Sequence, residues 1–314
     1  MGETRVAFFT DTFQEINGVA LTSRQFTEYA QRQNRAFVCF RGGPETKTTQ
    51  TGSVIHAELK RSRLVFPLDR GLFCDTLLWR YVHHVEAVLS EFQPDIIHIV
   101  SPGDVSTIGA YLAWRCKVPL AISWHTNLHE FAAMRLERLL GWFPKIARRS
   151  AAAVCEAQTL RACLAFYRLG AVLYAPNTEL VEMLQRSTGK PVFLMKRGID
   201  AALFNPARRT VDDQVLRLGY VGRIAPEKSV RFLKELESGL KAAGVPPFRF
   251  LVIGAAASAT GCATTSPPPI FPGSTGARNW PATMPIWTCS CFRRAQTRSG
   301  TWFWRPSLRG CRQW

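Results

Sequence analysis

The last sixty residues of the chain, 255–314, contain no aspartate, glutamate, lysine, valine or tyrosine. They hold one leucine and two isoleucines, but seven arginines, seven prolines and five tryptophans. A folded domain needs acidic residues for helix caps and solvated faces, and aliphatic residues for its core. We therefore predict that this segment, here called the tail, has no packed core. The 254 residues before it have the composition of a globular protein.

The abrupt change at Gly254 is typical of translation in a shifted reading frame. If one base were lost near codons 254 and 255, the codons of Trp302, Phe303 and Trp304 would require a valine followed by a leucine in the parent frame. Extended to both sides, the permitted parent sequences include VVLEALASG, which has the helical chemistry that the tail lacks. We predict an out-of-frame, disordered tail; the alternative is a genuine disordered Arg/Trp-rich segment.

The first 254 residues also lack several features. They contain no run of about 20 apolar residues and no long apolar segment near the N-terminus. Their cysteines form no CxxC pair and no zinc-ligand spacing, which favours small buried thiols in a reducing cytosol. These cysteines are Cys39, Cys74, Cys116, Cys155 and Cys163. We expect a cytoplasmic protein without a metal site.

The charge of the chain is less extreme than its net value of +17 implies, because seven of its cations lie in the tail. The first 254 residues hold 33 basic and 23 acidic residues, which suits an anionic ligand or an anionic membrane surface. No DNA- or RNA-binding motif accompanies these cations, so no nucleic-acid partner is expected. Residues 139–149 (LLGWFPKIARR) are predicted either to lie on an anionic bilayer, at the inner face of the membrane, or to form an ordinary core helix with a solvated face.

Apolar runs alternate with segments of helical spacing from residue 6 to residue 195. Strands are predicted at 6–10, 36–40, 96–100, 120–123, 171–175 and 192–195. Helices are predicted at 19–33, 77–92, 106–116, 134–152 (interrupted near Gly141 and Pro144) and 178–185. Strands separated by helices imply a parallel sheet with right-handed crossovers. We predict an α/β fold with one complete, doubly wound, Rossmann-like domain over residues 1–205.

A second domain begins after a polar stretch at 206–214, which is predicted to be a linker. A strand at 216–221, a helix at 229–243 and a strand at 248–254 follow, so residues 215–254 supply only the first βαβ unit of that domain.

Two loops of the first domain are candidate ligand sites, because each follows a parallel strand and therefore lies at the carboxyl edge of the sheet. In the first loop, Gly18 lets the backbone approach a ligand, and the next helix directs its N-terminus there; a tight turn without a ligand is the alternative. The second, SWHTNLHEF at 123–131, is interpreted as a loop with a ligand-facing His125 and a structural, hydrogen-bonding His129. The two histidines lie four apart, but no third metal ligand is evident.

A third segment, VGRIAPEKSV at 221–230, carries Arg223 and Lys228 where a strand passes into a helix. A guanidinium fork and an ammonium group near a positive helix end make a phosphate site; the alternative is two solvated cations.

Taken in order, TDTF…NGVA, HTNLHEF, RGID…LFNP and GRIAPEK resemble the family 4 glycosyltransferases of the GT-B fold, and the likeness runs from about Val6 to Gly254. The resemblance implies transfer of a sugar, with retention at the anomeric carbon, from a UDP- or GDP-sugar to a lipid or glycan acceptor, without a cofactor or bound metal. Gly18 would close on the donor diphosphate, Arg223 and Lys228 would neutralise it, and His125 would be catalytic. The acceptor side would hold Asp11, Asn17 and Asn127.

The chain departs from that family after Gly254, where the acidic pair that holds the donor sugar and the remaining strands of the second domain are absent. We therefore expect a glycosyltransferase that is inactive as this chain. Two alternatives stay open: an acceptor-side domain that binds without turnover, and a basic membrane- or nucleic-acid-binding protein that uses the Arg/Trp tail.

Overall fold

The structure is a computed structural model that describes residues 3–15, 17–64, 66–69, 72–199, 205, 216–221, 232–246, 248–253, 292–296 and 302–306. The chain divides into two compact units, Met1–Gly198 and Ile199–Trp314. The predicted linker at 206–214 lies outside the described residues, so the predicted domain limits stay predictions.

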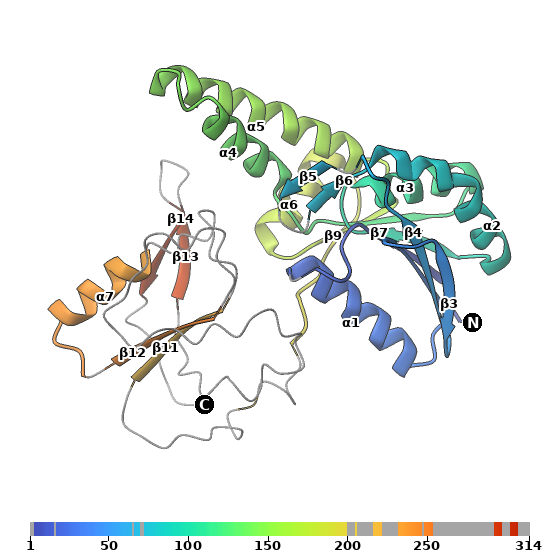
Figure 1. The fold of residues 1–314 in the computed structure, drawn as a ribbon, viewed down its shortest axis with the longest axis horizontal. Coiled ribbons are helices and arrows are strands. Elements are labelled where there is room, and N and C mark those ends of the chain that lie inside the picture. The colour runs from blue at the N-terminus through green and yellow to red at the C-terminus, as the bar shows by residue number, and fades with distance from the viewer. Residues whose placement is uncertain are drawn as a thin grey trace. The chain divides into compact units, whose positions relative to one another are not determined.

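The first unit is built on an eight-stranded sheet with the order β10-β9-β8-β7-β1-β2-β4-β3 (Figure 1). All neighbouring strands are parallel except β3 and β4. The strands are β1 (Val6–Thr10), β2 (Phe37–Gly43), β3 (Lys47–Thr51), β4 (Val54–Lys60), β7 (Ile96–Ile99), β8 (Leu120–Ser123), β9 (Val172–Ala175) and β10 (Val192–Leu194). A short antiparallel pair, β5 (Phe66–Asp69) and β6 (Leu72–Cys74), lies outside this sheet.

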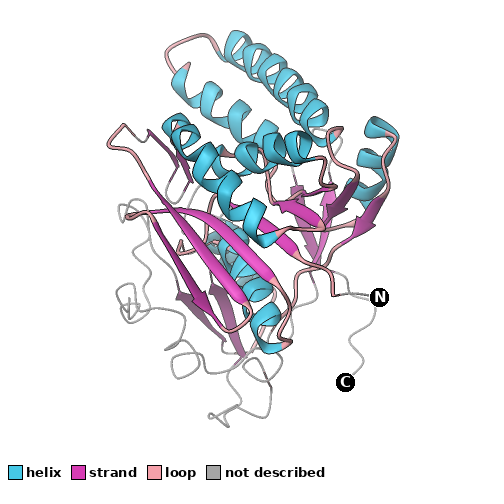
Figure 2. Ribbon diagram, turned by 90° about the vertical axis from the view of Figure 1, so that its right-hand side faces the viewer, coloured by secondary structure: helices cyan, strands magenta, loops and turns pink. Residues whose placement is uncertain are grey.

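Helices flank the sheet on both faces (Figure 2). They are α1 (Gly18–Arg32), η1 (Thr76–Tyr81, a 3-10 helix), α2 (Val82–Phe92), α3 (Asp104–Cys116), α4 (Leu128–Leu139), α5 (Lys145–Tyr167) and α6 (Thr178–Thr188). Phe8 packs with residues of α1, whereas its neighbour Phe9 belongs to the larger core that includes α2, α3, α5 and α6. The apolar run of β1 is therefore buried on both faces, as a central parallel strand requires. The predicted doubly wound, Rossmann-like α/β fold is confirmed.

Two predictions about secondary structure are wrong in part. The segment 123–131 is not a loop throughout, because α4 begins at Leu128; Glu130 in its first turn favours this start through the helix dipole. The helical region predicted at 134–152 is interrupted between Leu139 and Lys145, which confirms the predicted break near Gly141 and Pro144. Its predicted limits are wrong, because α4 begins at Leu128 and α5 continues to Tyr167.

The strands β3 and β4 were not predicted at all. All five residues of β3 (KTTQT) are exposed, so this edge strand has no apolar alternation that would reveal it. Its polar, lysine-bearing surface also protects the sheet edge from pairing with another chain.

The cysteines are less uniform than predicted. Cys39 and Cys163 are buried, whereas Cys155 is half-buried. Cys116 is exposed, which corrects the prediction of buried thiols; it is the last residue of α3, where the helix has left the core.

The second unit contains β11 (Leu216–Val221), α7 (Phe232–Ala242) and β12 (Phe248–Ile253), and its two strands pair in parallel. This is the βαβ unit that the sequence predicts. The described part of the tail is an antiparallel pair, β13 (Phe292–Gln296) and β14 (Trp302–Pro306). A two-stranded pair is at best marginally stable in water by itself.

No helix in the described part of the chain is both long and apolar enough to cross a membrane.

Candidate functional site

The candidate site lies where the chain changes direction within the sheet. From β1 the chain adds β2 and β4 on one side, and it then returns to add β7 on the other side of β1. In parallel α/β sheets, ligands bind at the carboxyl ends of the strands beside such a switch point. Here the relevant loops follow β1, β7, β8 and β10.

Asp11 joins two of these loops. Its Oδ1 accepts a hydrogen bond from the Val105 backbone N–H at 2.7 Å, and its Oδ2 accepts one from the Ser106 hydroxyl, also at 2.7 Å. Burial raises the pKa of Asp11 to about 6, although these two hydrogen bonds act in the opposite direction. Asp11 therefore fastens the loop after β1 to the first turn of α3. Its predicted place on the acceptor side stays a prediction.

The N-terminus of α1 forms part of the site and is capped by a side chain. The Asn17 side chain accepts a hydrogen bond from the Ala20 backbone N–H at 2.8 Å and so caps the helix. The positive end of this 15-residue helix then begins at Gly18. A Cβ atom on Gly18 would overlap the Nη1 atom of Arg197, so glycine allows the guanidinium to lie this close to the backbone.

Arg197 follows β10 and brings a full positive charge to the N-terminus of α1. Arg197 is exposed as a whole residue, but desolvation of its guanidinium lowers its pKa. Within the described part of the chain, no carboxylate lies within ion-pair distance of it. A cation at the positive end of a helix, without a neighbouring anion, is electrostatically unfavourable unless a ligand supplies the negative charge. Arg197 was not singled out in the sequence; only its place in the RGID motif, after a predicted strand, could have indicated it.

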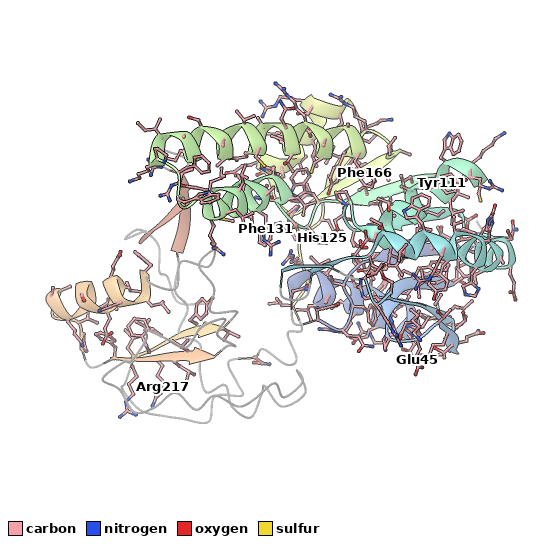
Figure 3. All side chains as sticks on the ribbon, turned by 45° about the horizontal axis from the view of Figure 1, so that its top comes forward. Glu45, Tyr111, His125, Phe131, Phe166 and Arg217 are labelled. Carbon is pink, nitrogen blue, oxygen red and sulfur yellow. The ribbon has the colours of Figure 1, made fainter. Side chains whose placement is uncertain are left out.

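His125, labelled in Figure 3, follows β8 and lies near enough to Arg197 for that charge to affect its titration. Burial, and secondarily Arg197, lowers the pKa of His125 to about 4, so the imidazole is neutral near pH 7. Its Nε2 atom is buried and has no hydrogen-bond partner. An orphaned imidazole nitrogen beside a cation is suited to a hydrogen bond with a polar ligand.

His98 on β7 lies next to His125 and was missed in the sequence, where it interrupts the apolar run IIHI. Its Nε2 is 2.5 Å from the Ser123 hydroxyl on β8. Burial, and secondarily the charge of His125, lowers the pKa of His98 to about 3. The hydrogen bond between His98 and Ser123 therefore links β7 to β8, the strand that His125 follows.

Asn127 and His129 have local structural contacts. The Asn127 Oδ1 accepts a hydrogen bond from the Trp124 indole at 2.8 Å, and its amide donates to Glu130 at 3.0 Å. His129 is buried, with Nε2 at 4.0 Å from Glu130 and an unpartnered Nδ1. Among the residues that the structure describes, no group of three His, Cys, Asp or Glu side chains is placed to hold a metal ion.

A cavity of about 770 Å³ lies elsewhere in the unit. It is lined near the amino ends of β1 and β2 by Val6 and Phe37, and also by Phe26, Tyr29 and His98. Because ligands of such sheets bind at the carboxyl ends, this cavity is not part of the candidate site. Arg223 and Lys228 lie outside the described residues, and their predicted roles stay predictions.

Comparison with known proteins identifies the family. The sequence profile of Glycosyltransferase Family 4 matches residues 16–203. The chain is 25% identical over 289 residues to a GDP-mannose-dependent alpha-mannosyltransferase of Mycobacterium tuberculosis, covering 86% of this chain and 68% of that protein. It is 23% identical over 287 residues to a protein of the same description from Corynebacterium glutamicum, covering 87% of this chain and 62% of that protein.

Among solved structures, the chain is similar to Anabaena HepE in complex with UDP and glucose, with a TM-score of 0.48 and 14% identity, over 81% of this chain and 62% of that one. The chain thus spans about two thirds of the length of these curated relatives and of the solved structure. The profile match covers more than half of the sequence, and the chain belongs to Glycosyltransferase Family 4.

Proposed function

We propose that the intact protein transfers a mannosyl residue from GDP-mannose to a lipid or glycan acceptor, with retention at the anomeric carbon. The named activity of two curated relatives supports the donor, and family membership supports the reaction class. UDP-sugars are the competing donors, because the described residues do not include a nucleoside pocket.

The observation that carries this proposal is a positive centre at the carboxyl edge of the sheet, which no carboxylate of the described residues compensates. It combines the N-terminus of α1 at Gly18 with the guanidinium of Arg197. A diphosphate has the charge and the acceptor oxygens that such a centre requires. In sugar transfer, negative charge grows on the diphosphate as its bond to the anomeric carbon breaks, so cations placed beforehand stabilise the transition state.

His125 supports the sugar rather than the phosphate in this proposal. With a pKa of about 4 it is neutral at physiological pH, so it does not deliver a proton as an imidazolium would. A neutral ring hydrogen-bonds a sugar or acceptor hydroxyl through the orphaned Nε2. Asp11, Asn17 and Asn127 hold the surrounding loops through the contacts given above. Arg223 and Lys228, which lie outside the described residues, are proposed to neutralise the donor diphosphate. No bound metal or cofactor is proposed.

We also propose that the 314-residue chain transfers sugar poorly or not at all. The second half of the donor site would come from the sequence that follows β12, and the composition of the tail supports a shifted frame there. The N-terminal unit has its own continuous core, which favours acceptor binding without turnover as the second candidate function. A cytoplasmic protein with peripheral contact at the inner face of the membrane fits a lipid acceptor.

The test compares this chain with a protein from a gene in which one base is restored between codons 252 and 258. Both are incubated with GDP-mannose or UDP-glucose and a membrane-lipid extract, and the products are analysed by mass spectrometry and by NMR of the anomeric proton. We expect α-mannosylated product from the restored protein and a rate at least about a thousand-fold lower from the 314-residue chain.

Robust transfer by the 314-residue chain would contradict the proposed inactivity. A restored frame that meets a stop within a few codons would contradict the frameshift. Transfer from UDP-glucose but not from GDP-mannose would contradict the proposed donor, whereas the proposed reaction class, sugar transfer, would stand.

A further inference from the structure

The connection between α4 and α5 exposes an unusual set of apolar side chains. Figure 1 shows the two helices side by side, with their connection at the end farthest from the sheet. We call residues 138–149 the α4–α5 tip. Leu139 is 77% exposed, Trp142 85% and Ile146 82%, and Phe143, in edge contact with Trp142, is half exposed.

These four side chains lie within eight residues, and Leu139, Trp142 and Ile146 are among the most exposed apolar groups of the described chain. Single exposed apolar residues are common on soluble proteins, but a cluster that includes tryptophan at a protruding turn marks an interaction surface. The alternative prediction for this segment, a core helix with a solvated face, is wrong at the tip, because its apolar side chains point into solvent.

The charges around the tip are mostly positive. Residues 135–149 include five basic side chains and a single acidic one, Glu137. Glu137 is paired with Arg148 at 3.9 Å. The other basic residues of the tip, Arg138, Lys145 and Arg149, are exposed. The surface therefore combines insertable apolar groups with cations that no neighbouring carboxylate neutralises within the tip.

We propose that the α4–α5 tip docks on the surface of an anionic lipid bilayer. Tryptophan and aliphatic side chains enter the interfacial region, while the arginines and the lysine contact anionic headgroups. A second copy of the chain fits less well, because two tips would bring like charges together. The inference rests on the proposed function in one respect, the lipid nature of the acceptor, and its test requires neither donor nor acceptor.

The test is sedimentation of the 314-residue chain with vesicles of phosphatidylcholine alone or with about 30% phosphatidylglycerol, at about 0.1 M and about 0.5 M salt. We expect binding to the anionic vesicles that weakens at high salt. Trp142→Ser with Ile146→Ser should weaken it at least about tenfold, and Lys145→Glu with Arg149→Glu should reduce it to the level seen with neutral vesicles.

The matched control is Trp114→Ser. Trp114 is 76% exposed on α3, so it has the exposure of Trp142 without belonging to the tip, and the control should bind like the unaltered chain. Absence of binding to anionic vesicles, or equal binding by the Trp142/Ile146 variant, would overturn the proposal and assign any binding to the tail or another surface. Loss of a dimer in that variant, without vesicle binding by the parent, would identify a second copy as the partner instead.

Discussion

In the N-terminal unit, the adjacent residues Phe8 and Phe9 enter two different clusters on opposite faces of one sheet. The tail also has aromatic residues, with five tryptophans in sixty positions, but it has one leucine, no valine and no acidic residue. Its described strands, β13 and β14, pair only with each other. Aromatic content alone therefore does not build a domain; aliphatic residues at strand and helix spacing, and polar caps, decide whether a core forms.

The largest expected effect is on the free energy of unfolding, when one tryptophan is replaced in the N-terminal unit and one in the tail. Trp124 is 2% exposed and its ring centroid lies 4.9 Å from that of Tyr167. Trp124→Ala should lower the free energy of unfolding by about 3–5 kcal/mol, because it leaves a large cavity in a packed core. Trp304→Ala in the tail should change it by less than about 0.5 kcal/mol.

Urea unfolding followed by circular dichroism measures both variants. Limited proteolysis of the unaltered chain is the independent control, and cleavage within residues 255–314 should come first. A tail that resists protease, or a Trp304→Ala variant that loses several kcal/mol, would show that the tail packs.

The sequence predicted much of the fold because the parallel strands are short apolar runs between turn residues. The limits of β1, β8 and β11 agree with the prediction to the residue. The β3–β4 pair was not predicted, because KTTQT, the sequence of β3, carries no burial pattern. The pairing of β3 with β4 depends on a contact rather than on periodicity. The start of α4 escaped because SWHTNLHEF is rich in polar residues that also favour loops.

The next effect concerns pH. The tail contains no Asp, Glu, His, Lys or Tyr, so no side chain in it titrates between about pH 4 and 7. In the N-terminal unit, the pKa of His98 is lowered to about 3. Between about pH 4 and 7, His98 binds a proton in the unfolded chain but not in the folded chain. The free energy of unfolding therefore decreases as pH falls below about 6.5.

His98→Gln should reduce the loss of unfolding free energy between about pH 6.5 and 4.5 by about 2 kcal/mol, since glutamine does not titrate. The raised pKa of Asp11 acts in the opposite sense in both proteins, because folding is then favoured by its protonation at low pH. Urea unfolding at several pH values gives the slope. An identical slope in both proteins would mean that His98 titrates normally.

The site was predicted in part, and the missing part has a physical reason. Gly18 and His125 follow strands whose carboxyl ends meet at one edge, so their proximity follows from the α/β pattern. Arg197 lies close to Gly18 although β10 is the edge strand, with β9, β8 and β7 between it and β1, and a one-dimensional pattern does not give this proximity. The bonds from Val105 and Ser106 to Asp11 likewise join loops that are far apart in the sequence.

The third effect is on the affinity for pyrophosphate, and it compares a cation of the site, Arg197, with a surface cation, Lys196. Arg197→Met should weaken binding of pyrophosphate to the 314-residue chain about tenfold, because a charge-assisted contact at the positive end of α1 is lost. Lys196→Met removes the neighbouring exposed charge and should change the affinity less than about twofold. Isothermal titration calorimetry measures both, and equal losses would reduce the effect to general charge attraction.

The smallest effect compares two helix caps with the same geometry. The side chains of Asn17 and Asn177 each accept a hydrogen bond at 2.8 Å from the backbone N–H three residues on, at the starts of α1 and α6. Replacing either by alanine should cost about 1 kcal/mol of unfolding free energy. Only Asn17→Ala should also weaken pyrophosphate binding, because Asn17 fixes the backbone next to Gly18, whereas α6 begins away from the switch point. If both variants lost the same stability and bound pyrophosphate unchanged, Asn17 would act only as a helix cap. The anion site would then not lie at the N-terminus of α1.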